Sequence, residues 1–198
     1  MNTPLNQPIN SKEEKIANFD PNGVGDVNGG LFGLPFTVEE AEVVIVPVPW
    51  EVTVSYSGGT AQGPLAVKEA SPQLDLFEPA IKDAWKLGIA MEEISADWEA
   101  TSETLRGKAE AYINWLEDGS PASEQEAYAN LPVEVTQKGE ELLQWLKSKA
   151  LGYLDQGKLV GVLGGDHSTP LGLMHALAEH HEEYGILQVD AHADERDA

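Results

Sequence analysis

A continuous run of β-branched residues at 42–47, Glu-Val-Val-Ile-Val-Pro, restricts the fold of this chain more than any other feature. A strand with one side facing solvent alternates apolar and polar residues, whereas an unbroken apolar run is typical of a parallel strand buried on both faces. Apolar runs at 159–163 and 184–189 predict two further strands, and the segment 85–91 predicts another. The predicted fold class is therefore α/β, with a mainly parallel sheet.

Helices are predicted between these strands. Gly63-Pro64 is expected to open a short helix, because proline suits the first helical turn. The predicted helices span residues 63–70, the segment from a cap at Thr101 or Ser102 to 118, about 133–155, and the segment that begins at Pro170. Alternating strands and helices indicate a parallel sheet, in which ligands collect at the carboxyl ends of the strands.

The first 38 residues are polar and interrupted by proline and glycine, which predicts an N-terminal arm (1–38) without helical periodicity. Leu31, Phe32 and Phe36 give this arm apolar side chains that can dock on a neighbouring surface. Such an arm either packs on another subunit or is a disordered tail, and the sequence favours neither. Residues 39–198 are expected to form the first part of a single α/β domain.

The charge and composition of the chain limit the partners and binding sites that can be expected of it. The chain carries 34 acidic against 12 basic residues, a formal charge of −22, so its surface repels phosphate backbones and no nucleic acid is expected as a partner. An acidic surface attracts small cations, or simply keeps the protein soluble. The absence of cysteine excludes thiolate metal sites. No apolar run is long enough for a signal peptide or a membrane span, so a cytoplasmic protein without membrane contact is expected.

Asp190, His192 and Asp194 form a D-x-H-x-D cluster directly after the predicted strand at 184–189. In an extended segment, residues two apart point to the same side with backbones about 6.5 to 7 Å apart, so these three side chains can converge on one pocket. A divalent cation relieves the repulsion between the two carboxylates, and mixed oxygen and imidazole ligation suits Mn²⁺, Ni²⁺, Zn²⁺ or Fe²⁺ better than Ca²⁺. The alternative is a solvated acidic loop that contains a histidine.

A second cluster, Gly164-Gly165-Asp166-His167-Ser168, follows the strand at 159–163. If neighbouring strands carry both clusters, His167 becomes a fourth ligand, while Asp166 is expected to orient a ligand or nearby backbone. Ser168 is not expected to be a nucleophile, because the G-x-S-x-G pattern is absent. The Gly-rich loop at 55–64 matches neither common phosphate-binding pattern, so no phosphate site is predicted there.

Together, GGDHS at 164–168 and VDAHAD at 189–194 resemble the paired signatures of the ureohydrolases, the family of arginases, agmatinases, guanidinobutyrases and formimidoylglutamases. The stretch at 46–78 is similar to the family's first strand and the loop that leads into its G-P-x-x-[IV]-[KR]-x-A-S segment. The resemblance covers about residues 40–198. The NGGLFGLPF segment at 28–36 looks most like the agmatinase-related subgroup that includes nickel-dependent guanidine hydrolases.

The resemblance implies a three-layer α/β/α fold and a homotrimer or homohexamer, with the N-terminal arm as the expected contact. It implies two divalent metal ions, Mn²⁺ or Ni²⁺. His167 would bind one ion and His192 the other, Asp190 would bridge them, and Asp194 would complete the first ion's shell. Asp194 is also the expected catalytic residue, accepting and passing on a proton while a hydroxide attacks a guanidinium carbon and urea is released.

The family supplies further ligands from a later D-x-D segment, which these 198 residues do not contain. The expectation is thus a fold that is incomplete at the C-terminus and a chain that is inactive alone. The alternative function is a non-catalytic metal-binding or assembly partner of a complete ureohydrolase. A deacetylase-like hydrolase is disfavoured, since its histidine-rich signature differs from GGDHS. The sequence leaves open whether guanidine or agmatine is the substrate and which metal is used.

Overall fold

The computed structural model describes residues 11–54, 57–123 and 125–192. With η denoting 3₁₀ helices, its elements in chain order are α1 (Lys12–Asn18), η1 (Leu31–Gly33), β1 (Val43–Val48), η2 (Thr60–Gln62), α2 (Gly63–Ala70), η3 (Ser71–Gln73), η4 (Ala84–Leu87), β2 (Ile89–Met91), α3 (Ala96–Glu117), α4 (Gln125–Tyr128), α5 (Leu131–Leu154), β3 (Leu159–Gly164) and α6 (Leu171–His180).

The predicted parallel sheet is confirmed. β1 is its central strand and pairs in parallel with β2 on one side and β3 on the other, in the order β2-β1-β3. Val44, Val46 and Val48 of β1 are completely buried, as the unbroken β-branched run predicted. Because Val48 pairs with Gly164, β1 and β3 end side by side, and their following loops leave the same edge of the sheet.

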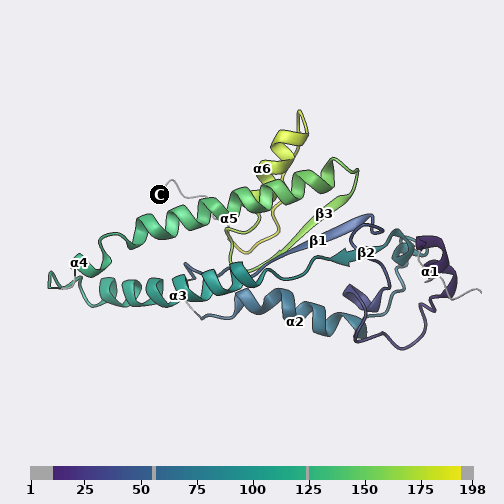
Figure 1. The fold of residues 1–198 in the computed structure, drawn as a ribbon, viewed down its shortest axis with the longest axis horizontal. Coiled ribbons are helices and arrows are strands. Elements are labelled where there is room, and N and C mark those ends of the chain that lie inside the picture. Colours follow the sequence, from purple (N-terminus) through teal and green to yellow (C-terminus); the bar gives the residue numbers. More distant parts are fainter. Residues whose placement is uncertain (1–10, 55–56, 124, 193–198) are drawn as a thin grey trace, which may run out of the picture.

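The helices complete a three-layer arrangement. α5 and α6 lie on one side of the sheet and α2 on the other (Figure 1). Val46 and Val48 pack against Leu142 and Leu146 of α5, while α3 runs beside α5 and adds Leu105 to the same core. At Gly172 of α6, an added Cβ would lie 2.8 Å from Leu146, so glycine lets the two helices approach closely. The predicted α/β class is therefore confirmed.

The N-terminal arm contains more structure than the sequence predicted. α1 is a helix because Ser11 and Glu14 form a capping box: each side chain accepts a hydrogen bond from the other's backbone N–H, at 3.2 and 3.4 Å. Leu34 and Phe36 are buried in a cluster with Trp85 of the same chain. The prediction of an arm without helical structure is thus wrong for Lys12–Asn18.

Two predicted boundaries are wrong for local reasons. α3 starts at Ala96, where the Ser95 side chain accepts from the Trp98 N–H at 3.3 Å, so neither Thr101 nor Ser102 is the cap. The predicted strand at 85–91 is limited to Ile89–Met91. Gly88, with φ of +74°, closes the short 3₁₀ turn before it, and the chain becomes extended only after this residue.

The predicted strand at 184–189 does not form. Ile186, Leu187 and Val189 are exposed, and β3 has no neighbouring strand on its outer edge among the described residues. Strand propensity expresses packing on a half-buried surface, and no described element buries these side chains. The contacts that place the segment come from side chains, such as the Tyr184 hydroxyl, which donates to the Met174 carbonyl at 3.2 Å.

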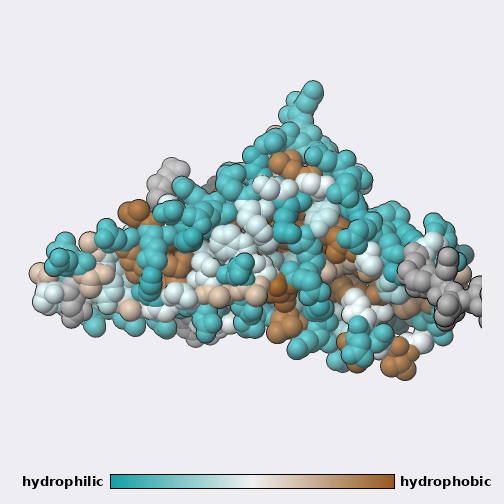
Figure 2. Space-filling model, viewed as in Figure 1, coloured by the Kyte–Doolittle hydropathy of each residue, from teal (hydrophilic) through white to brown (hydrophobic). Residues whose placement is uncertain are grey.

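The viewed surface is mostly hydrophilic. Figure 2 shows hydrophilic residues over most of the viewed face, with isolated hydrophobic patches along the helices. Within the described part of the chain, no helix combines the length and apolar character needed to cross a membrane.

Candidate functional site

The GGDHS turn lies at the edge where β1 and β3 end. The Asp166 N–H donates to the Trp50 carbonyl at 2.7 Å, which ties this turn to the loop after β1. An added Cβ at Gly165 would lie 2.2 Å from the same carbonyl oxygen, so the close approach requires glycine. The second glycine of the motif is therefore explained by packing of one backbone against another.

Asp166 organises the turn from within. Its Oδ1 accepts hydrogen bonds from the Ser168 N–H at 3.0 Å and the Ser168 hydroxyl at 2.6 Å, and its carbonyl accepts from the Thr169 hydroxyl at 2.9 Å. This confirms the expected role of Asp166 in orienting nearby backbone. The turn leaves the neighbouring His167 exposed at the strand end.

Asp166 also holds the one buried side-chain acceptor without a hydrogen-bond partner in the described part of the chain, its Oδ2 atom. A buried carboxylate oxygen is costly to leave unpaired, so this atom favours a donor or a positively charged group beside it.

Asp190 lies between the two predicted histidine ligands. Its Oδ2 is 3.8 Å from Nε2 of His167, and its Oδ1 is 3.7 Å from Nδ1 of His192. The His192 N–H also donates to Oδ1 at 2.9 Å. This backbone hydrogen bond holds the pKa of Asp190 below its ordinary value; burial opposes it, and the nearby His167 and His192 add to the lowering. The carboxylate therefore stays ionised and faces both rings.

Among the described residues, the predicted ligands lie close together only two at a time, Asp190 with His167 and Asp190 with His192. No group of three or more histidine or acidic residues within 11–54, 57–123 and 125–192 is close enough to hold a metal ion. The fourth predicted ligand, Asp194, lies outside the described residues.

Glu51 is a polar residue at this edge that the sequence analysis did not single out. It follows β1, and its carboxylate accepts the Gly59 N–H at 2.6 Å. One glutamate after a strand has no distinctive sequence pattern, so no signal marked it except its place at the carboxyl end of a predicted strand.

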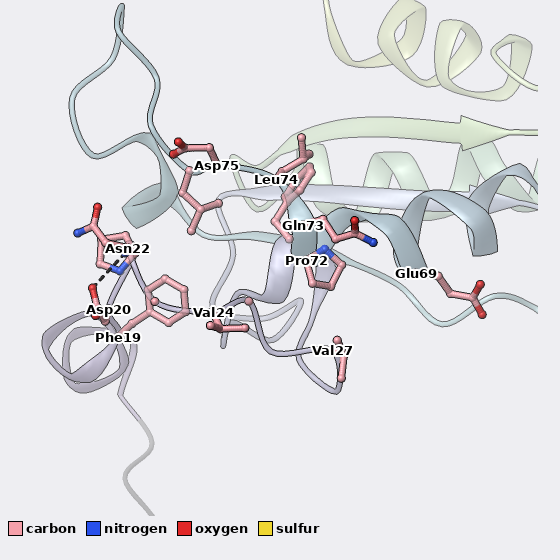
Figure 3. A pocket seen from close by; sticks show the side chains of 15 residues that line it. Phe19, Asp20, Asn22, Val24, Val27, Glu69, Pro72, Gln73, Leu74 and Asp75 are labelled. Carbon is pink, nitrogen blue, oxygen red and sulfur yellow. Dashed lines mark hydrogen bonds between the residues drawn. The ribbon is translucent and has the colours of Figure 1, made fainter.

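A separate hollow of about 550 Å³ lies between the arm and the segment after α2 (Figure 3). Phe19, Val24 and Leu74 contribute apolar surface to it, and Asp20 and Asp75 contribute carboxylates. None of the predicted metal ligands lines it. The candidate site therefore remains at the carboxyl edge of the sheet.

Comparisons with known proteins agree on one family. The model of the Arginase family matches residues 41–198. N(1)-aminopropylagmatine ureohydrolase of Thermus thermophilus is 32% identical over 156 residues, which cover 79% of this chain and 41% of that protein. The protein of the same name from Synechocystis is 27% identical over 164 residues, covering 80% and 42%, and an agmatinase of Bacillus anthracis is 27% identical over 160 residues, covering 81% and 43%.

The chain spans about two fifths of the length of these curated relatives. No solved structure matches it.

Proposed function

Because the chain belongs to the arginase family, we propose that it supplies part of a hydrolase that cleaves a carbon–nitrogen bond of a guanidino compound and releases urea. The observation that carries the proposal is the position of Asp190, whose two oxygens face His167 and His192 at the carboxyl edge of the sheet. The relatives named as agmatinases and N(1)-aminopropylagmatine ureohydrolases support a substrate of the agmatine type. Guanidine is proposed as the other substrate from the resemblance of residues 28–36.

We propose that the side chains at this edge would hold a pair of divalent cations, on the chemistry of their donor atoms. A carboxylate between two imidazoles is a mixed oxygen and nitrogen donor set of the kind that Mn²⁺ and Ni²⁺ accept. His167 is proposed to hold one ion, His192 the other and Asp190 both, with Asp194 completing the first ion's shell. When bound, such a pair supplies a hydroxide at neutral pH.

The chain's own residues contribute charge and proton transfer. Asp190 remains ionised because its pKa is lowered by the His192 N–H and the flanking rings, so it can hold two cationic neighbours. The formal charge of −22 raises the local concentration of a guanidinium substrate. Asp194 is proposed to take a proton from the attacking water and pass it to the amine that leaves.

We also propose how the chain is organised and assembled. Residues 1–38 are the arm and 39–198 the first part of one α/β domain, in a cytoplasmic homotrimer or homohexamer that forms through the arm. Val24 and Val27 support this, because these apolar side chains of the arm remain fully or largely exposed.

A second candidate is a non-catalytic metal-binding or assembly partner of a complete ureohydrolase. The exposure of His192, at 80% of its side chain, and of Leu187 and Val189 favours it, because a partner chain can cover this surface. The two candidates differ in whether the chain itself takes part in turnover.

Urea release from guanidine and agmatine, with Mn²⁺ or Ni²⁺ added, separates the candidates. The main proposal expects little or no urea from these 198 residues alone and urea from the protein that also contains the later D-x-D segment. In that protein, urea release should be lost in Asp190→Asn and unchanged in His175→Asn, which alters an exposed histidine of α6 outside the site. Absence of urea with either metal from the protein that contains the D-x-D segment contradicts a part in catalysis and leaves the assembly partner.

A further inference from the structure

The loop after β1 is held by a single carboxylate. Oε2 of Glu51 accepts the Gly59 N–H at 2.6 Å, the Ala61 N–H at 3.0 Å and the Thr60 hydroxyl at 3.1 Å. Burial alone would raise the pKa of Glu51, but these hydrogen bonds outweigh it and the pKa lies below the ordinary value. The carboxylate is therefore ionised at neutral pH, and hydrogen bonds to an ionised acceptor are about twice as strong as neutral ones.

Glu51 is itself fixed from the other side by α3. Its N–H donates to the hydroxyl of Ser102, a buried residue of that helix, at 3.1 Å. One turn further along α3, the Arg106 guanidinium donates to the carbonyl of Val54. The loop is thus attached to a rigid helix at its base, while the Glu51 side chain reaches across to hold its far end.

The held loop lies against the GGDHS turn. An added Cβ at Gly63, where the loop enters α2, would lie 3.5 Å from the Gly164 carbonyl oxygen. Trp50, the residue before Glu51, accepts the hydrogen bond from Asp166 that fixes the turn beside His167. At the carboxyl edge, Trp50 therefore contacts the GGDHS turn through its carbonyl. Glu51 contacts the loop after β1 through its carboxylate.

We propose that Glu51 is a positioning residue that holds the Gly58–Ala61 loop beside His167, so that this loop forms one wall of the guanidino-substrate pocket. The inference rests on the proposed function for the identity of the substrate. The held loop follows β1 at the carboxyl edge of the sheet, and three of its hydrogen bonds go to one ionised side chain. Loss of the Glu51 side chain is expected to release the Gly58–Ala61 loop and to leave the proposed metal ligands in place.

Amide hydrogen exchange tests whether Glu51 holds the loop. Glu51→Leu removes the acceptor in a side chain of similar size, while Glu51→Gln keeps one acceptor oxygen without the charge. We expect exchange at Gly59 and Ala61 to be about tenfold faster in Glu51→Leu and to be partly restored in Glu51→Gln. Glu103→Leu is the matched control, because Glu103 is an exposed glutamate of α3 that lines, together with Glu51, a hollow of about 410 Å³.

Kinetics test whether the held loop serves the substrate. In the protein that releases urea, Glu51→Leu is expected to raise KM for the guanidino substrate about tenfold with a smaller change in kcat, and Glu51→Gln to recover part of the loss. A general loss of structure would instead lower the active fraction and leave KM unchanged.

The outcomes separate this inference from the proposed function. Equal exchange at Gly59 and Ala61 in the wild type and Glu51→Leu overturns the role of Glu51, and so does an unchanged KM. Absence of urea from the protein that contains the D-x-D segment overturns the proposed function instead, and the exchange rates still decide whether Glu51 holds the loop.

Discussion

Nε2 of His167 lies 3.8 Å from Oδ2 of Asp190, although the whole of α6 separates the two residues in the sequence. The contact joins the turn after β3 to the segment after α6 at one edge of the sheet. Parallel sheets bind ligands at this edge, because the loops that follow the strands converge there. His167 of the GGDHS motif and Asp190 of the VDAHAD motif are therefore close together in the chain itself.

Gly165→Ala tests the close approach that holds the GGDHS turn. Its Cβ would lie 2.2 Å from the Trp50 carbonyl oxygen, which is backbone and cannot move aside cheaply. We expect a loss of about 2 to 4 kcal/mol in the free energy of unfolding, measured by urea denaturation. Gly152→Ala is the control, since an added Cβ there meets nothing within 4 Å and the residue lies inside α5.

Gly152→Ala is itself expected to stabilise the protein by about 0.5 to 1 kcal/mol, because alanine favours the helix. Equal effects of the two substitutions would contradict the packing explanation for Gly165.

Lys158→Met tests how the arm is joined to the sheet. The Lys158 ammonium donates to the carbonyls of Val38, Glu39 and Ala41 at 2.6, 2.8 and 3.0 Å. Removing the charge leaves these carbonyls without their donor, so we expect a loss of about 1 to 3 kcal/mol in thermal or chemical unfolding. Lys147→Met, which removes a surface ion pair with Glu179, should cost less than about 1 kcal/mol. A larger effect at Lys147 than at Lys158 would refute this assignment.

The ion pair between Glu40 and Lys15 of α1 should make the stability of the protein depend on pH in acid. Burial raises the pKa of Glu40, but the Lys15 ammonium at 2.6 Å and the Thr37 N–H together hold the pKa below its ordinary value. A depressed carboxyl pKa adds stability above the unfolded-state value of about 4.3, and this stability is lost as the pH falls through the folded-state pKa. The melting temperature of the wild type should therefore fall more steeply below about pH 4.3 than that of Glu40→Gln. Parallel curves for the two proteins would exclude this contribution.

The sequence predicted the elements whose burial decides their structure. β1 is an unbroken apolar run because both of its faces are covered. α5 has apolar residues at helical spacing because one of its faces packs against the sheet. Ser95 and Ser102 both lie near the start of α3, so residue type alone does not tell which one caps the helix. In the fold Ser95 is the cap, and the Ser102 hydroxyl accepts the Glu51 N–H.

Features that depend on partners distant in the sequence were harder to predict. The segment 184–189 has strand composition, but a strand also needs a neighbour that the described residues do not provide. The hydrogen bonds of Glu51 run from a side chain to the backbone of a loop, and such contacts leave no pattern of residue types. The sequence placed His167 and Asp190 together by assigning the runs before them to one parallel sheet; the two residues do lie close, although the segment 184–189 does not join the sheet.

Titration of the purified protein with Mn²⁺ and with Ni²⁺, followed by calorimetry, tests the role of Asp190 most directly. Its two oxygens face two histidines, so we expect Asp190→Asn to weaken binding of the metal at least about tenfold, with His175→Asn unchanged. Binding of equal affinity and stoichiometry in the wild type and in Asp190→Asn would contradict the proposal that Asp190 joins the two metal ions.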